Sequence, residues 1–70
     1  MNENLTIGFA NCLRLHIHEL PDDKSDVVCK LRYMTEIAID EDESTTEFYK
    51  VYTAVGAEGY ARKDCVIIKQ

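Results

Sequence analysis

The sequence predicts an all-β fold, a small barrel of five to six short antiparallel strands. Apolar and polar residues alternate in several short runs, which is the period of a half-buried strand. Aromatic and β-branched residues alternate on the way to a turn at Gly56 within residues 47–61, as in a β-hairpin with one packed face. Turn-forming residues separate the runs at the short intervals that are typical of small barrels.

The first third of the chain contains two alternating runs, residues 5–9 and residues 13–18. Each is predicted to form a strand, because successive side chains of a strand point to opposite faces. The second run ends at Pro21, which has no backbone N–H to donate and is followed by two aspartates that favour a turn.

Residues 26–34 are ambiguous. Val27, Leu31 and Met34 recur at helical spacing, but the same stretch also divides into two faces by strand parity. The sequence therefore leaves two alternatives, a strand with a turn or a helix over residues 26–35 within an α+β fold.

The second half of the chain continues the all-β pattern. In order, the sequence predicts a strand at residues 37–39, an exposed acidic loop at 40–46, the hairpin at 47–61, a single 3-10 turn near 62–65 and a last strand at 66–68.

Seventy residues form one domain, and a chain this short buries only about 60% of the surface that it exposes when unfolded. We expect residues 1–10 to be an N-terminal arm or a first strand and residues 11–70 to be the barrel. If residues 5–9 lie at a sheet edge, they offer a route to a homodimer.

The cysteines predict a reducing compartment. Cys12, Cys29 and Cys65 are an odd number without a close pairing motif, so we expect three small buried side chains and no disulfide framework. The first residues lack a basic and apolar leader, and no window reaches the length of a membrane span. The expected location is cytoplasmic, and extracellular only if an export signal has been removed.

The net charge of −5 is unevenly distributed. Residues 1–49 carry eleven acidic and four basic side chains, whereas residues 50–70 carry two acidic and four basic ones. Because an acidic surface repels phosphate groups, we expect no direct nucleic-acid binding. The lack of a window long enough to span a membrane predicts no membrane partner.

The hairpin supplies the candidate ligand-binding residues. Strand parity places Tyr49 and Val51 on the core side and leaves an aromatic row beside a lysine on the other side. The candidates for contact with a protein or peptide are Phe48, Lys50, Tyr52, Tyr60 and Tyr33.

Four consecutive acids are the second candidate group. Asp40, Glu41, Asp42 and Glu43 are expected to steer a basic partner or to keep the loop solvated. The run lacks the glycine and the ligand spacing of a calcium loop.

The remaining residue types give no basis for a catalytic, metal or cofactor site. His16 and His18 share a strand face and are expected to be a surface pair rather than zinc ligands, because no ligand spacing accompanies them. No glycine-framed serine or paired buried carboxylate is evident, and an enzyme would need one of the cysteines beside a histidine. We therefore expect a non-enzyme.

The order of these motifs resembles the bacterial SH3 domain family. Residues 15–21 take the place of the family's leucine-asparagine-valine-arginine and glycine-proline motifs, and Phe48-Tyr49-Lys50-Val51 that of its tryptophan-x-lysine-valine. Residues 56–61 are similar to its closing glycine-x-x-glycine-tyrosine-valine element. The resemblance covers most of residues 13–68 and implies an SH3-like barrel.

The chain departs from this family at positions that shape the first loop and the groove. His16 and His18 replace asparagine and arginine, Leu20 replaces glycine, and Phe48 replaces tryptophan. Some family members bind cell-wall peptides, but these departures mean that the family's ligand does not carry over.

The sequence leads to three hypotheses about function. The first is a binding module that recognises a protein or peptide through the exposed aromatic surface. The second is an acidic phage or mobile-element inhibitor that binds a basic, nucleic-acid-handling host protein. The third is a cell-wall peptide-binding domain, as the resemblance implies.

Overall fold

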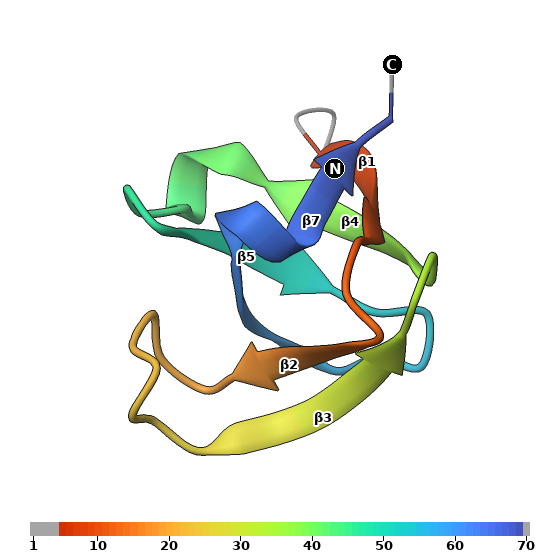
Figure 1. Cartoon of the computed structure of the whole chain (residues 1–70). Coiled ribbons are helices and arrows are strands. Elements are labelled where there is room, and N and C mark those ends of the chain that lie inside the picture. Colours follow the sequence, from red (N-terminus) through yellow and green to blue (C-terminus); the bar gives the residue numbers. More distant parts are fainter. Residues whose placement is uncertain (1–4, 70) are drawn as a thin grey trace.

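The computed structural model describes residues 5–69, and these residues are all-β (Figure 1). Its strands are β1 (Leu5–Ala10), β2 (Arg14–His18), β3 (Val27–Arg32), β4 (Glu36–Asp40), β5 (Phe48–Tyr52), β6 (Glu58–Arg62) and β7 (Val66–Ile68). Two 3-10 turns, η1 (Glu41–Glu43) and η2 (Lys63–Cys65), precede β5 and β7. The all-β prediction and the predicted turn near residues 62–65 are confirmed.

The strands form one antiparallel sheet in the order β3-β2-β6-β5-β4-β1-β7. The sheet curls, so that β2 and β3 lie on one side of the molecule and β1, β4 and β7 on the other, with β5 between them (Figure 1). The two edges of the sheet are β3 and β7. β1 pairs with β4 along residues 5–9 and with β7 at residues 8–10, so it lies inside the sheet rather than at its edge. A homodimer through an edge strand stays a prediction.

The ambiguous stretch is a strand, and the alternative of a helix over residues 26–35 is wrong. Pairing of β3 with β2 decides it, because Leu31 opposite Leu15 and Cys29 opposite Ile17 place apolar residues on one face. Seven strands are present in residues 5–69, more than the five to six predicted. The same residues contain no helix that is long and apolar enough to cross a membrane.

The core lies on the inner face of the curled sheet. Its largest fully buried side chains come from alternate positions of β2, β4 and β5: Leu15, Ile17, Ile37, Ile39 and Val51. Tyr49 packs against this cluster, so the prediction that Tyr49 and Val51 point inward is confirmed.

Gly59 lets β2 approach β6 closely. The two strands pair only at His18 opposite Tyr60, and a Cβ atom on Gly59 would lie 2.7 Å from Cγ2 of Ile17. A larger residue would force β2 away from β6, and β2 carries the loop of residues 19–26 that covers part of the sheet.

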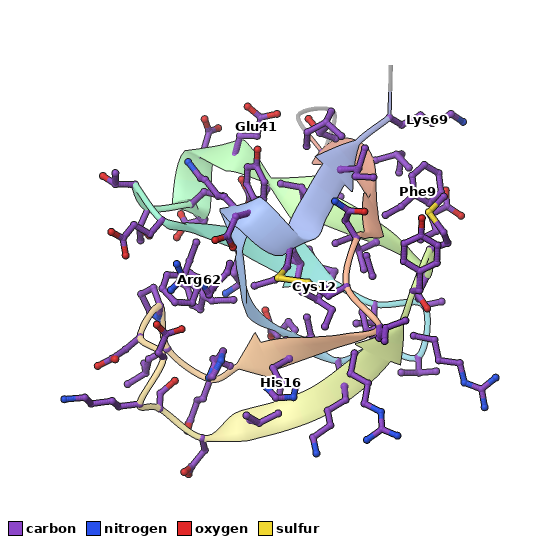
Figure 2. The ribbon with its side chains drawn as sticks, in the orientation of Figure 1. Phe9, Cys12, His16, Glu41, Arg62 and Lys69 are labelled. Carbon is purple, nitrogen blue, oxygen red and sulfur yellow. A yellow bond between two sulfur atoms is a disulfide. The ribbon has the colours of Figure 1, made fainter. Side chains whose placement is uncertain are left out.

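The prediction that all three cysteines are unpaired is wrong. Cys12 and Cys65 form a disulfide, with Cα atoms 5.5 Å apart (Figure 2). The fold brings them together because the link between β1 and β2 lies against η2, where the Asn11 N–H donates to the Cys65 carbonyl at 2.8 Å. Their separation of 53 residues gives no local spacing signal. Cys29 is the free cysteine of the described residues.

We predict that the disulfide contributes much of the stability. A cross-link that closes a long loop typically stabilises a small domain by about 2–4 kcal/mol. The paired replacement Cys12→Ser with Cys65→Ser should lower the free energy of unfolding by that amount in a denaturant titration. The control Cys29→Ser should retain a reductant-sensitive transition, and a parent transition that reductant does not shift would contradict the prediction.

Candidate binding surfaces

The outer face of the β5–β6 hairpin carries a compact group of polar and aromatic side chains. Lys50 lies opposite Tyr60, and Tyr52 lies opposite Glu58. The Lys50 Nζ is 5.0 Å from the ring centroid of Tyr60 and 5.8 Å from that of Tyr52. It also lies 3.5 Å from Oε1 of Glu58. The side chain of Lys50 is only 18% exposed, so cation–π contacts and an ion pair fix its position.

A hollow of about 210 Å³ lies beside Tyr52 on the same face. Ile7 pairs with Ala38, and Ala38 pairs with Tyr52, so the three residues form a row across β1, β4 and β5. The small Ala38 leaves space between two larger side chains. Residues that line the hollow are Ile7, Glu36, Ile37, Ala38, Tyr52, Thr53 and Ala54. We call the outer surface formed by Ile7, Ala38, Lys50, Tyr52 and Tyr60 the Tyr52 face.

Phe48 does not belong to this open surface, and the prediction that it faces solvent is wrong. It points outward by strand parity but is only 3% exposed. The ring of His18 packs edge-on against it at 6.1 Å between centroids, and the guanidinium of Arg62 lies 5.8 Å from its centroid. His18 and Arg62 therefore cover Phe48 on the outer side of the sheet, at the end of β5 that the loop of residues 19–26 approaches.

The structure does not bring Tyr33 to the Tyr52 face. Tyr33 lies in the turn between β3 and β4 and is 55% exposed. Of the five aromatic-site residues predicted from the sequence, the structure gathers Lys50, Tyr52 and Tyr60. The sequence does not single out Ile7 and Ala38, because their place beside Tyr52 depends on the register of three strands.

The predicted acidic loop is ordered by short-range hydrogen bonds. The Asp42 N–H donates to Oδ1 of Asp40 at 3.1 Å, which caps η1. The Ser44 hydroxyl donates to the Asp40 carbonyl at 2.9 Å, and the Thr6 hydroxyl donates to Oε2 of Glu41 at 2.9 Å. Glu41, Asp42 and Glu43 are exposed. The backbone of the turn thus places four acidic side chains near the end of β4, where Asp40 lies opposite Lys50 in the sheet.

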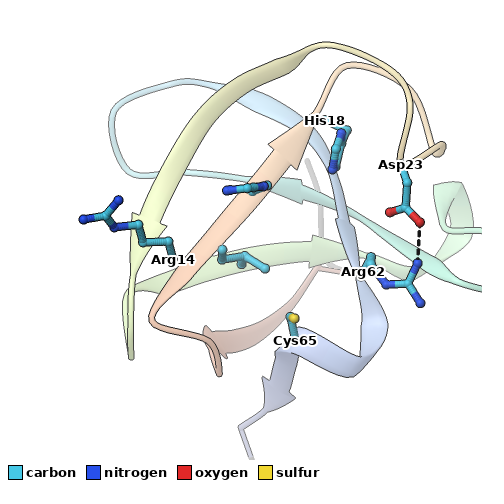
Figure 3. Close-up of a pocket in the computed structure, with 7 residues that line it drawn as sticks. Arg14, His18, Asp23, Arg62 and Cys65 are labelled. Carbon is cyan, nitrogen blue, oxygen red and sulfur yellow. Dashed lines mark hydrogen bonds and ion pairs between the residues drawn. The ribbon is translucent and has the colours of Figure 1, made fainter.

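A second hollow, of about 140 Å³, lies between β2 and η2 (Figure 3). The residues that line it are Arg14, Leu15, His16, His18, Asp23, Arg62 and Cys65. The ion pair between Arg62 and Asp23, at 2.7 Å, links β6 to the loop of residues 19–26. Arg62 donates a hydrogen bond to the Asp64 carboxylate, and this bond together with the nearby charge of Asp23 raises the pKa of Arg62. The charge of Arg62 is therefore balanced locally.

The prediction that His18 lies on the surface is wrong. This residue is only 7% exposed, and its Nδ1–H donates to the Ser25 carbonyl at 3.2 Å. His16 is exposed. Residues 5–69 hold no group of three His, Cys, Asp or Glu side chains placed to bind a metal ion.

The cysteines do not offer a reactive thiol beside these histidines. Cys65 lines the same hollow as His16 and His18, but its sulfur is bonded to Cys12. Burial raises the pKa of the Cys29 thiol, which lowers the fraction of nucleophilic thiolate. Among the described residues, no free cysteine thiol therefore lies beside a histidine as an activated nucleophile.

Comparison of the chain with protein-family models, with curated proteins and with solved structures finds no match.

We predict that Phe48 acts in stability rather than in ligand contact. Truncation of a buried phenylalanine to alanine usually costs about 3–5 kcal/mol, so Phe48→Ala should largely unfold the domain. The exposed Tyr33→Ala should change the free energy of unfolding by less than about 0.5 kcal/mol. Thermal melts followed by circular dichroism measure both, and a fully folded Phe48→Ala variant would contradict the packing described.

Proposed function

We propose that this chain is a non-catalytic module that binds a protein or peptide through the Tyr52 face. The observation that carries the proposal is the apolar row of Ile7, Ala38 and Tyr52 on the outer side of the sheet. Packing of the core on the inner face does not explain this row, because residues on the outer face of a small barrel are ordinarily polar. A hollow at its centre matches the way in which pockets receive single side chains of a peptide.

The rim of the Tyr52 face favours a basic partner. Glu36 lines the hollow, Glu58 pairs with Lys50, and Asp40 leads into the ordered acidic turn. Complementary charge mainly accelerates association and excludes wrong partners. The proposed ligand is therefore an extended segment with an apolar residue for the hollow and lysine or arginine beside it.

The curled, all-β sheet agrees with the SH3-like barrel that the resemblance to bacterial SH3 domains implies, and we keep this family as a proposal about the fold. A short turn, η2, directly precedes the last strand. Phe48 occupies the place of the family's tryptophan but is covered by His18 and Arg62. The proposed surface therefore lies farther along β5, at Tyr52.

The disulfide bears on where the module works. Disulfides persist in oxidising compartments and are rare in the cytosol, so the Cys12–Cys65 bond favours an oxidising compartment over the cytoplasmic location expected from the sequence. Cell-wall peptides remain candidate partners under this proposal.

The alternative function, an inhibitor of a basic nucleic-acid-handling protein, rests on the acidic turn. Hydrogen bonds fix the backbone of η1 and the carboxylates of Asp40 and Glu41, which lowers the entropy lost when the turn binds a basic surface.

We predict that filling the hollow weakens peptide binding without unfolding the domain. Peptides selected from a random library on the parent chain should carry a basic residue next to an apolar one. Ala38→Leu should weaken their binding by at least about tenfold, because one displaced apolar side chain is worth about 1.5–3 kcal/mol. Fluorescence anisotropy measures the affinities, and Tyr33→Ala is the matched control on an exposed tyrosine outside the face. Equal affinity of Ala38→Leu and the parent would remove the proposed site.

We predict that neutralising the acidic turn will distinguish the peptide-binding module from the inhibitor. Joint replacement of Glu41→Gln, Asp42→Asn and Glu43→Gln should slow association of the selected peptides severalfold and leave their dissociation rate nearly unchanged, as expected for charges at a rim. Stopped-flow binding at low and high salt measures these rates. If the triple variant instead loses all binding while Ala38→Leu retains it, the inhibitor hypothesis is favoured over the peptide module.

A further inference from the structure

The β2–β3 hairpin presents four basic side chains on one exposed face. Arg14 lies directly opposite Arg32, and His16 lies directly opposite Lys30. Directly opposite residues point to the same side of a sheet, about 5 Å apart, and alternate residues of one strand are about 7 Å apart. All four side chains are exposed. We call this surface the basic hairpin face.

The placement of these charges is unfavourable for the isolated domain. Arg14 and Arg32 are like charges directly opposite on the sheet, which lowers its stability. Neither these two side chains nor those of His16 and Lys30 form an ion pair or side-chain hydrogen bond with residues 5–69. Asp23 lines the same hollow as Arg14 and His16, but its carboxylate pairs with Arg62. Glu41 of the acidic turn and His16 lie at opposite ends of the view in Figure 2. An anionic group from outside the domain would relieve the repulsion.

The basic hairpin face borders an open sheet edge. β3 pairs with β2 alone, so backbone groups along its other side are free to pair with an added strand. Charged side chains on an edge strand ordinarily prevent such pairing, and this accounts for Lys30 and Arg32. It does not account for Arg14 and His16, because β2 lies inside the sheet.

We propose that β3 accepts an acidic, extended polypeptide segment from a partner as an additional strand. Glutamates or aspartates at alternate positions of that segment would lie beside Lys30 and Arg32, with Arg14 and His16 in the second row. Nucleic acid fits less well, because the net charge of −5 repels a long polyanion whereas a short segment feels mainly the local charges. The surface is distinct from the Tyr52 face, and its ligand has the opposite charge.

The test uses a fluorescein-labelled peptide with glutamate alternating with threonine and valine, titrated into the full chain at low salt. Binding should weaken as salt is raised, and the pair Lys30→Gln with Arg32→Gln should weaken it by about tenfold or more. Lys69→Gln, which removes an exposed lysine beyond β7, is the matched control and should bind like the parent. Thermal melts of the double variant should show stability equal to or higher than that of the parent. Such a result would exclude unfolding as the cause of weaker peptide binding.

Amide hydrogen exchange identifies the mode of binding. Saturating peptide should slow exchange of the β3 amides that do not pair with β2, which strand addition requires. Absence of peptide binding at low salt, or binding that leaves those amides unprotected, would overturn the proposal. A single-stranded oligothymidine that binds the basic hairpin face more tightly than the peptide would overturn it in favour of nucleic acid.

Discussion

The packing of Phe48 beneath the loop of residues 19–26 determines which part of the outer sheet is open. His18 lies edge-on against the Phe48 ring, Arg62 lies over it, and Asp23 holds Arg62 from the loop. The loop is itself braced by Ser25, whose hydroxyl donates to the carbonyls of Leu20 and Asp22. One end of β5 is therefore buried on both faces, while the other end leaves Tyr52 beside a hollow.

Much of the fold could be predicted from the sequence because its signals are local. Alternation in residues 13–18 and 47–61 fixes which side chains face the core, and Val51 is buried as expected. The stretch at residues 26–34 shows where this reasoning ends, since Leu31 fits both a helical and a strand pattern. Its pairing with Leu15 decides the matter, and such pairing is not encoded in any short window.

The parts that could not be predicted depend on contacts between distant residues. Phe48 has the strand parity of an exposed side chain, and only the loop that returns over it makes it part of the interior. Cys12 and Cys65 meet because the curled sheet places the β1–β2 link against η2. Two residues of the predicted site, Lys50 and Tyr60, lie opposite each other in a hairpin, and such local pairing can be predicted from the sequence. Ala38 becomes the floor of a hollow only through the register of β1, β4 and β5.

We propose that the open end of β5, and not the covered end, is the binding surface. The most direct measurement is a map of backbone amide chemical shifts during titration with a selected peptide. We expect the changes to be concentrated at the Tyr52 face, that is, at Ile7, Ala38, Lys50, Tyr52 and Tyr60. Changes concentrated instead at His16, His18 and Arg62, around the hollow between β2 and η2, would contradict it.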